Sequence, residues 1–228
     1  QPKNLRFISR TNLNTKPLGV NTMKNIVYII IIMILISCTS SKSIELKSNK
    51  TISETFNKSE IKNLQIIFDF FNGQICDSKQ MNKDLLNECY EKYCSEIREQ
   101  YKVEYEFNPK VNFKQQLEMY NKIDKSTFNE IWDFQKKWTT KTQSDTLKHL
   151  GLSYTGKYKD FLQNYGKVNK AIHQYSESFN ASGDLSPTMT AGLLMSYEYY
   201  DISDIRTKLI IAIQYLTLND QNKRIEQY

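Results

Sequence analysis

Apolar residues recur every three or four positions through most of the chain after residue 58, which is the spacing of amphipathic helices. One such stripe runs over 59–76, where Ser59 is a natural N-cap, and another over 82–101, where Asn82 has that role. Few glycines or prolines interrupt these stripes. The pattern predicts an all-α fold, an irregular bundle of about six to eight helices. Later helices are expected over 112–122, from Ser126 to Trp138, over 157–182, from Ser186 to Tyr197, and from Ser203 to Leu218.

Signals at helix ends support several of these boundaries. Gly183 follows the 157–182 segment as a C-cap would, and Ser186-Pro187 places a cap before an N1 proline. Leu209–Leu218 is apolar on most sides, which predicts a central helix, and a polar tail is expected over Asn219–Tyr228. The remaining short pieces are an extended segment at 103–107, a polar loop at 139–145 and one helical turn at 146–150.

An apolar run near the N-terminus differs from the amphipathic segments. Ile26–Ile36 is roughly 11 residues long, whereas a bilayer-spanning helix needs ~20. It follows Met23 and Lys24 and carries no charge, which makes a core helix with one polar face a poor alternative. This layout predicts a secretory signal peptide over 23–37. Residues 1–22 are expected to be an upstream extension that is not native or is disordered.

The end of this run, Leu35-Ile36-Ser37-Cys38, resembles the lipobox of bacterial lipoproteins. In that family the cysteine sulfur receives a diacylglyceryl group, the signal peptide is cut before it, and the new amine is acylated. The resemblance implies lipidation of Cys38 and membrane attachment without a spanning helix. The alternative is an ordinary apolar helix with a buried cysteine. The leader and composition are similar to those of small uncharacterised lipoproteins of Bacteroidota, and the rest of the chain resembles no family that we recognise.

The stretch after Cys38 is rich in Ser, Thr, Lys and Asn, with no aromatic residue before Phe56. It predicts a flexible tether over 38–58 that carries a helical domain over 59–228. Surface-exposed lipoproteins of Bacteroidota tend to have acidic residues just after the cysteine, and Thr39–Ser43 has none. The resemblance therefore places the chain in the cell envelope, on the periplasmic face of the outer membrane.

Most of the net positive charge lies in the predicted leader and the residues before it. The whole chain has a formal charge of +6, but five basic residues and no acid precede Cys38, which leaves +1 for the remainder. A nearly neutral chain with mixed charges is not typical of nucleic-acid-binding proteins. The expected partners are therefore the membrane, through the lipid on Cys38, and an envelope protein, with no nucleic acid.

Three cysteines follow Cys38, and an exported protein meets an oxidising compartment where one disulfide and one spare thiol are expected. Two helices joined by a short connection lie antiparallel, so the end of the first approaches the start of the second. This geometry favours a Cys76–Cys89 disulfide, because Cys94 lies ~8 Å further along the helix axis. Cys94 is then either an inert cysteine or a redox thiol.

Motifs that carry catalytic chemistry are scarce. The sequence has no Gly-x-Ser-x-Gly elbow, no phosphate-binding glycine loop and no His-Glu-x-x-His. Ser59-x-x-Lys62 matches a serine acyltransferase motif in letters only, and the pair Asp201 and Asp204 fits helix capping better than cation binding. His173 has no partner near in sequence. We therefore expect no catalytic residue, no metal site and no cofactor.

Tyr197, Tyr199 and Tyr200 form the densest aromatic cluster. Consecutive helical residues cannot all face inward, so some of these rings are expected at the surface as a binding patch. The alternative is a partly buried rim. Two function classes remain: a non-enzymatic binding or structural module of the envelope, which we favour, and an enzyme with a dispersed active site. A deep cleft with converging polar groups favours the enzyme, and a flat aromatic patch favours the binding module.

Overall fold

The computed structural model describes residues 44–77, 82–104, 108–138 and 146–226. All of them belong to one compact unit, Ser41–Tyr228. The predicted signal peptide over 23–37 and the lipidation site Cys38 lie outside the described residues, as does the predicted loop at 139–145.

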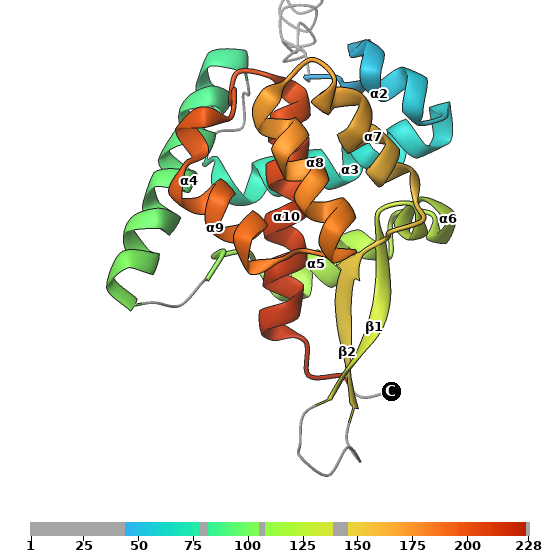
Figure 1. Cartoon of the computed structure of the whole chain (residues 1–228), viewed down its shortest axis with the longest axis vertical. Coiled ribbons are helices and arrows are strands. Elements are labelled where there is room, and N and C mark those ends of the chain that lie inside the picture. The colour runs from blue at the N-terminus through green and yellow to red at the C-terminus, as the bar shows by residue number, and fades with distance from the viewer. Residues whose placement is uncertain (1–43, 78–81, 105–107, 139–145, 227–228) are drawn as a thin grey trace, which may run out of the picture. The chain divides into compact units, whose positions relative to one another are not determined.

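The described chain is mostly helical, with one small sheet (Figure 1). The prediction of a multi-helix fold is therefore confirmed, although the fold is not purely all-α. The α-helices are α2 (Lys50–Thr55), α3 (Lys58–Ile75), α4 (Lys83–Glu104), α5 (Phe113–Tyr120), α6 (Lys125–Asn129), α7 (Lys157–Gly166), α8 (Lys170–Ser182), α9 (Pro187–Met195) and α10 (Ile205–Lys223). Two 3₁₀ turns, η1 (Leu46–Ser48) and η2 (Tyr197–Tyr199), and two strands, β1 (Trp132–Trp138) and β2 (Thr146–Leu152), complete the fold.

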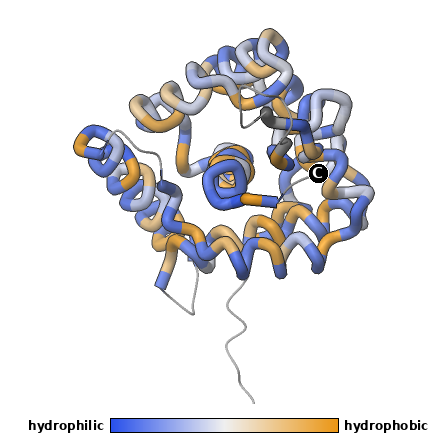
Figure 2. The backbone as a smooth tube through the Cα atoms, turned by 90° about the horizontal axis from the view of Figure 1, so that it is seen from below, coloured by the Kyte–Doolittle hydropathy of each residue, from blue (hydrophilic) through white to orange (hydrophobic). Residues whose placement is uncertain are grey.

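Helix α10 is the centre of the fold, as its apolar sequence predicts. Seen along its axis, it is surrounded by the other elements (Figure 2). Every residue from Leu209 to Thr217 is fully buried. Two polar residues of this stretch accept hydrogen bonds from buried neighbours: Thr217 from Trp132 Nε1 (2.7 Å), and Gln214 from Tyr175 Oη (2.7 Å). A helix that is apolar all round is stable only when neighbours cover every face.

A β-hairpin replaces two predicted helical segments. The helix predicted from Ser126 to Trp138 ends after α6, and the turn predicted at 146–150 is also wrong. Strands β1 and β2 pair antiparallel, with Trp132 opposite Leu152 and Phe134 opposite Leu150. Apolar residues at every second position in a short run fit a strand as well as a helix, and the pairing partner decides between them.

The segment predicted as one helix over 157–182 is two helices, α7 and α8, joined by three residues. Val168 lies in this connection and is 74% exposed, although its spacing fitted the apolar stripe. The Asn169 side chain accepts a hydrogen bond from Ile172 N and starts α8. The two helices approach closely, since a Cβ on Gly166 would lie 3.0 Å from His173 Cα. Local capping therefore ends one helix and begins the next.

The predicted tether is wrong over its second half. Leu46 on η1, Ile52 on α2 and Phe56 are all buried in the core. Helix α3 begins at Lys58 rather than after Ser59, because Asn57 forms a capping box with Glu60. Lys157 adds an ion pair to Glu60 (2.6 Å) from α7. Scattered apolar residues thus join the core once short helices bring them to one face.

The predicted ends of other segments are partly right. Gly183 has a left-handed φ of 75° and ends α8, and the Ser186 side chain caps α9, which begins with Pro187. The polar tail predicted from Asn219 is wrong at its start, because α10 continues to Lys223 and buries Asn219 and Asp220 completely. The extended segment predicted at 103–107 is helical as far as Glu104, and 105–107 lie outside the described residues.

Candidate functional site

The cysteines lie where α3 ends and α4 begins. The Sγ atoms of Cys76 and Cys89 are 2.12 Å apart, with a Cα–Cα distance of 5.6 Å, so the predicted pair is confirmed at disulfide distance. Cys94 is unpaired but buried, and burial raises the pKa of its thiol to about 12. A thiol that is covered and protonated at neutral pH is a poor nucleophile. Cys94 therefore has the environment of an inert core cysteine.

The three tyrosines of the predicted patch have different surroundings. Tyr197 is 9% exposed, and the guanidinium of Arg98 lies 4.7 Å from its ring centroid. Tyr200 is half-buried, and this burial raises the pKa of its hydroxyl. Tyr199 is 82% exposed. Of the three rings, Tyr199 therefore offers the largest free surface for a partner.

Helix α9 extends this exposed surface. Its sequence has no charged residue, yet Ala191 and Met195 are exposed, and Met195 keeps 40% of its surface. Tyr199 follows on the η2 turn directly after the helix. We call Ala191, Met195 and Tyr199 the α9 surface. Neighbouring exposed apolar side chains of this kind are a common feature of protein-binding sites.

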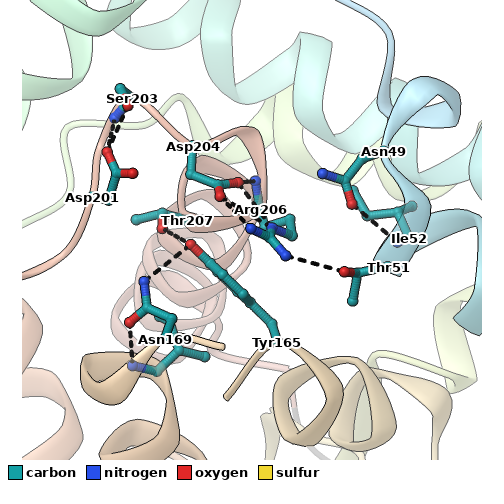
Figure 3. A network of polar contacts seen from close by, with 11 residues as sticks. Asn49, Thr51, Ile52, Tyr165, Asn169, Asp201, Ser203, Asp204, Arg206 and Thr207 are labelled. Atoms are coloured by element: carbon teal, nitrogen blue, oxygen red, sulfur yellow. Dashed lines mark hydrogen bonds and ion pairs between the residues drawn. The ribbon is translucent and has the colours of Figure 1, made fainter. Parts of the chain in front are cut away.

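A polar network at the start of α10 has a structural role (Figure 3). Asp204 caps the helix and pairs with Arg206 (2.6 Å), whose Nη1 donates to Thr51 Oγ1 (3.1 Å) on α2. The Arg206 guanidinium also lies 3.9 Å from the ring centroid of Tyr165 on α7. Burial raises the pKa of Asp204, but the hydrogen bonds from Arg206 outweigh burial, so the pKa is lowered overall. The groups of this network come from α2, α7 and the start of α10 and contact one another. The network therefore holds α2 and α7 against α10. Asp201 caps locally by accepting from Ser203 N (3.0 Å).

An apolar groove of about 880 Å³ lies beside the first described residues. Phe56 and Ile61 form its apolar floor, and Lys47, Lys58 and Lys62 lie at its rim. The full lining is Glu45, Lys47, Ser48, Ser53, Phe56, Asn57, Lys58, Ile61, Lys62 and Gln65. The sequence pattern did not reveal this groove, because it predicted a flexible tether over 38–58. The Asn57-x-x-Glu60 spacing is a capping signal that could have indicated a helix start there.

A second cleft of about 650 Å³ lies between the hairpin and the end of α10. Phe134 is 40% exposed there and stacks on Phe128, with ring centroids 5.8 Å apart. Arg224 lies 4.8 Å from the Phe134 centroid and pairs with Glu226 (2.7 Å), which also pairs with Lys148. These charges join the last described residues to the hairpin.

Catalytic chemistry has little support among the described residues. No group of three His, Cys, Asp or Glu side chains there could hold a metal ion. Burial raises the pKa of both Asp184 and Asp220, but each has a structural partner. Asp184 accepts from Leu152 N (2.8 Å), and Asp220 pairs with Arg224 (2.7 Å).

The other candidates for chemistry are dispersed. His173 is exposed on α8, while Ser59 donates to Asp124 (3.3 Å). Within the described ranges, none of the helices combines the length and apolar character that a membrane span requires.

The chain was also compared with known proteins. No family matches it, and neither the curated proteins nor the solved structures gave a match.

Proposed function

We propose that this chain is a lipid-anchored envelope protein whose helical unit is a non-enzymatic binding module. Cys38 is the attachment point, and the Cys76–Cys89 pair is oxidised in the compartment where the unit resides. The absence of acidic residues in Thr39–Ser43 supports the periplasmic face of the outer membrane. An envelope protein is the partner that this proposal requires.

The α9 surface is the observation on which the binding role depends. Core-forming residues such as Met are costly to leave in water, so an uncharged surface helix followed by an 82% exposed tyrosine fits a contact with a partner. The enzyme alternative lacks a comparable observation: in the cleft beside Phe134, the charged residues Lys148, Arg224 and Glu226 pair with one another.

Metabolic labelling with radioactive palmitate tests the anchor. We expect the full chain to incorporate label and to lose residues 1–37, whereas Cys38→Ser remains an unlabelled precursor. Ser41→Ala is the matched control, because it lies three positions away and leaves Cys38 in place; it is expected to label normally. Equal labelling of Cys38→Ser, or no label on the unaltered chain, contradicts the anchor.

Site-specific photo-crosslinking tests the binding surface. A photoreactive phenylalanine analogue at Tyr199 is expected to crosslink to one envelope protein in intact cells. The same analogue at Val168, which is 74% exposed on the α7–α8 connection, is expected to give no such product. Loss of the crosslink on adding Met195→Lys would assign it to the α9 surface. Identical products from both positions would contradict a specific surface.

A further inference from the structure

We propose that the groove formed by η1, α2 and the start of α3 binds an anionic phospholipid of the membrane that holds Cys38. This inference rests on the proposed anchoring and adds a second membrane contact, made by the folded unit itself. The groove volume of about 880 Å³ lies within the range of small-molecule sites, ~300–1,000 Å³. Its floor of Phe56 and Ile61 suits the apolar part of a lipid.

The charge at the rim matches a phosphate headgroup. Lys47, Lys58 and Lys62 line the groove, and Glu45 is the one acidic residue in the lining. Glu45 pairs with Lys47 (2.9 Å), while Lys58 and Lys62 have no ion pair within the described ranges. Long lysine stems also cover apolar surface while their ammonium groups stay at the rim. A groove with an apolar floor and two unpaired cations above it matches one end of an anionic lipid better than it matches a neutral ligand.

The chain path brings this groove close to the anchor. Gln65 holds the first described residues against α3, since its side chain accepts from Leu46 N (2.9 Å) and donates to Ile44 O (3.0 Å). Cys38 is six positions before Ile44, and six residues span at most ~20 Å when fully extended. A lipid on Cys38 therefore keeps the groove within reach of the bilayer surface.

Other possible occupants explain only one of the two features of the groove, its apolar floor or its lysines. The acyl chains attached to Cys38 are neutral, so they explain the apolar floor but not the lysines. A second copy of the chain would bring Lys47, Lys58 and Lys62 near their own counterparts unless acidic residues faced them. An anionic lipid satisfies both features, because basic residues near an anionic leaflet are attracted to it.

Hydrogen exchange on the lipidated full-length product tests this proposal. The protein is reconstituted into vesicles of phosphatidylcholine alone or with phosphatidylglycerol, and amide exchange is followed over residues 46–62. We expect exchange to be slower in the anionic vesicles. Lys58→Gln/Lys62→Gln is expected to weaken docking by about fivefold per lysine and to remove most of the difference. Lys92→Gln/Lys102→Gln on α4, which lies on the other side of the unit from α2 (Figure 1), should retain it.

The possible results separate this inference from the proposed function. Equal exchange in both vesicles, with lipid confirmed on Cys38 by mass spectrometry, overturns the groove proposal and leaves the anchor intact. Protection that is equal in both vesicles and unchanged by the lysine substitutions would mean that the protein's own acyl chains occupy the groove. Protection that depends on protein concentration would mean that a second copy of the chain occupies it. Either result overturns the groove proposal. A mass without lipid contradicts the anchor, and the comparison of the two vesicles then still tests the groove.

Discussion

Lys208 is a lysine buried in the core. It lies on α10 with 2% exposure, and its Nζ donates to Asn87 Oδ1 (2.7 Å). Among the described residues, no carboxylate forms an ion pair with it. Burial lowers the pKa of Lys208 from 10.5 to about 8. The folded protein therefore holds a costly charge at neutral pH.

Replacing this charge is expected to stabilise the protein. Lys208→Met removes the charge and leaves an unbranched side chain that is one atom shorter, and Asn87 is half-buried, so water can reach its amide. We expect the free energy of unfolding at pH 7 to rise by about 1–2 kcal/mol, as when buried charges are replaced by apolar side chains. Urea denaturation measures it. The matched control is Lys223→Met at the exposed end of the same helix, which should change stability by less than about 0.5 kcal/mol.

The pH dependence of stability gives the same residue a second test. Because the folded pKa of Lys208 is depressed, its stabilising contribution is complete above pH 10.5 and is lost as pH falls through about 8. The advantage of Lys208→Met should therefore shrink as pH rises from 7 to 9.5. An advantage that is constant over this window would show that the ammonium charge is not its cause.

At the scale of elements, the junction between α6 and α7 depends on close backbone contact. A Cβ on Gly156 would lie 2.4 Å from Glu130 O, an atom that also accepts a hydrogen bond from Tyr158 N (3.0 Å). The Glu130 side chain accepts from Lys157 N (2.8 Å) as well. The junction therefore has no room to move away from a new methyl group without losing these bonds.

Two glycine substitutions are expected to act in opposite directions. Gly156→Ala should lower the free energy of unfolding by about 1–3 kcal/mol, because it overpacks backbone. Gly73→Ala on α3 meets no atom within 4 Å and should raise it by about 0.5–1 kcal/mol, because alanine has the higher helix propensity. Thermal and urea denaturation measure both. A neutral Gly156→Ala would mean that the junction is looser than the structure has it.

At the scale of the whole molecule, the first described residues belong to the folded unit. Leu46, Ile52 and Phe56 are each at most 2% exposed, and α2 is also joined to α10 through Thr51 and Arg206. The unit therefore begins near Ser41 rather than at Ser59. Six positions separate Cys38, the proposed lipidation site, from Ile44, the first described residue.

Two fragments test this boundary. A chain of residues 59–228 should be less stable than one of 41–228 by about 5–9 kcal/mol, from the loss of three buried side chains at ~1.5–3 kcal/mol each. That loss is comparable to the whole stability of many domains, so the shorter fragment should fail to unfold cooperatively. Circular dichroism during heating distinguishes the two. Equal unfolding midpoints for the two fragments would mean that residues 41–58 do not stabilise the fold, as the predicted tether implies.

The sequence by itself determined the features that depend on neighbouring residues. Helix content, the central position of Leu209–Leu218, the caps at Gly183 and Ser186, and the Cys76–Cys89 pair all follow from spacing within a few turns. These interactions join residues close in sequence, so their pattern is visible along the chain. The signal peptide and the lipid on Cys38 remain predictions, because they lie outside the described residues.

Only the tertiary structure decided which ambiguous segments became strands or core. Trp132 bonds Thr217 from 85 positions away, and Arg206 reaches Thr51 from 155 positions away. These contacts place the hairpin against α10 and bring η1 and α2 into the core, which creates the lysine-rimmed groove. The physical reason is that short segments have weak local preferences, and burial against distant partners supplies the free energy that selects their conformation.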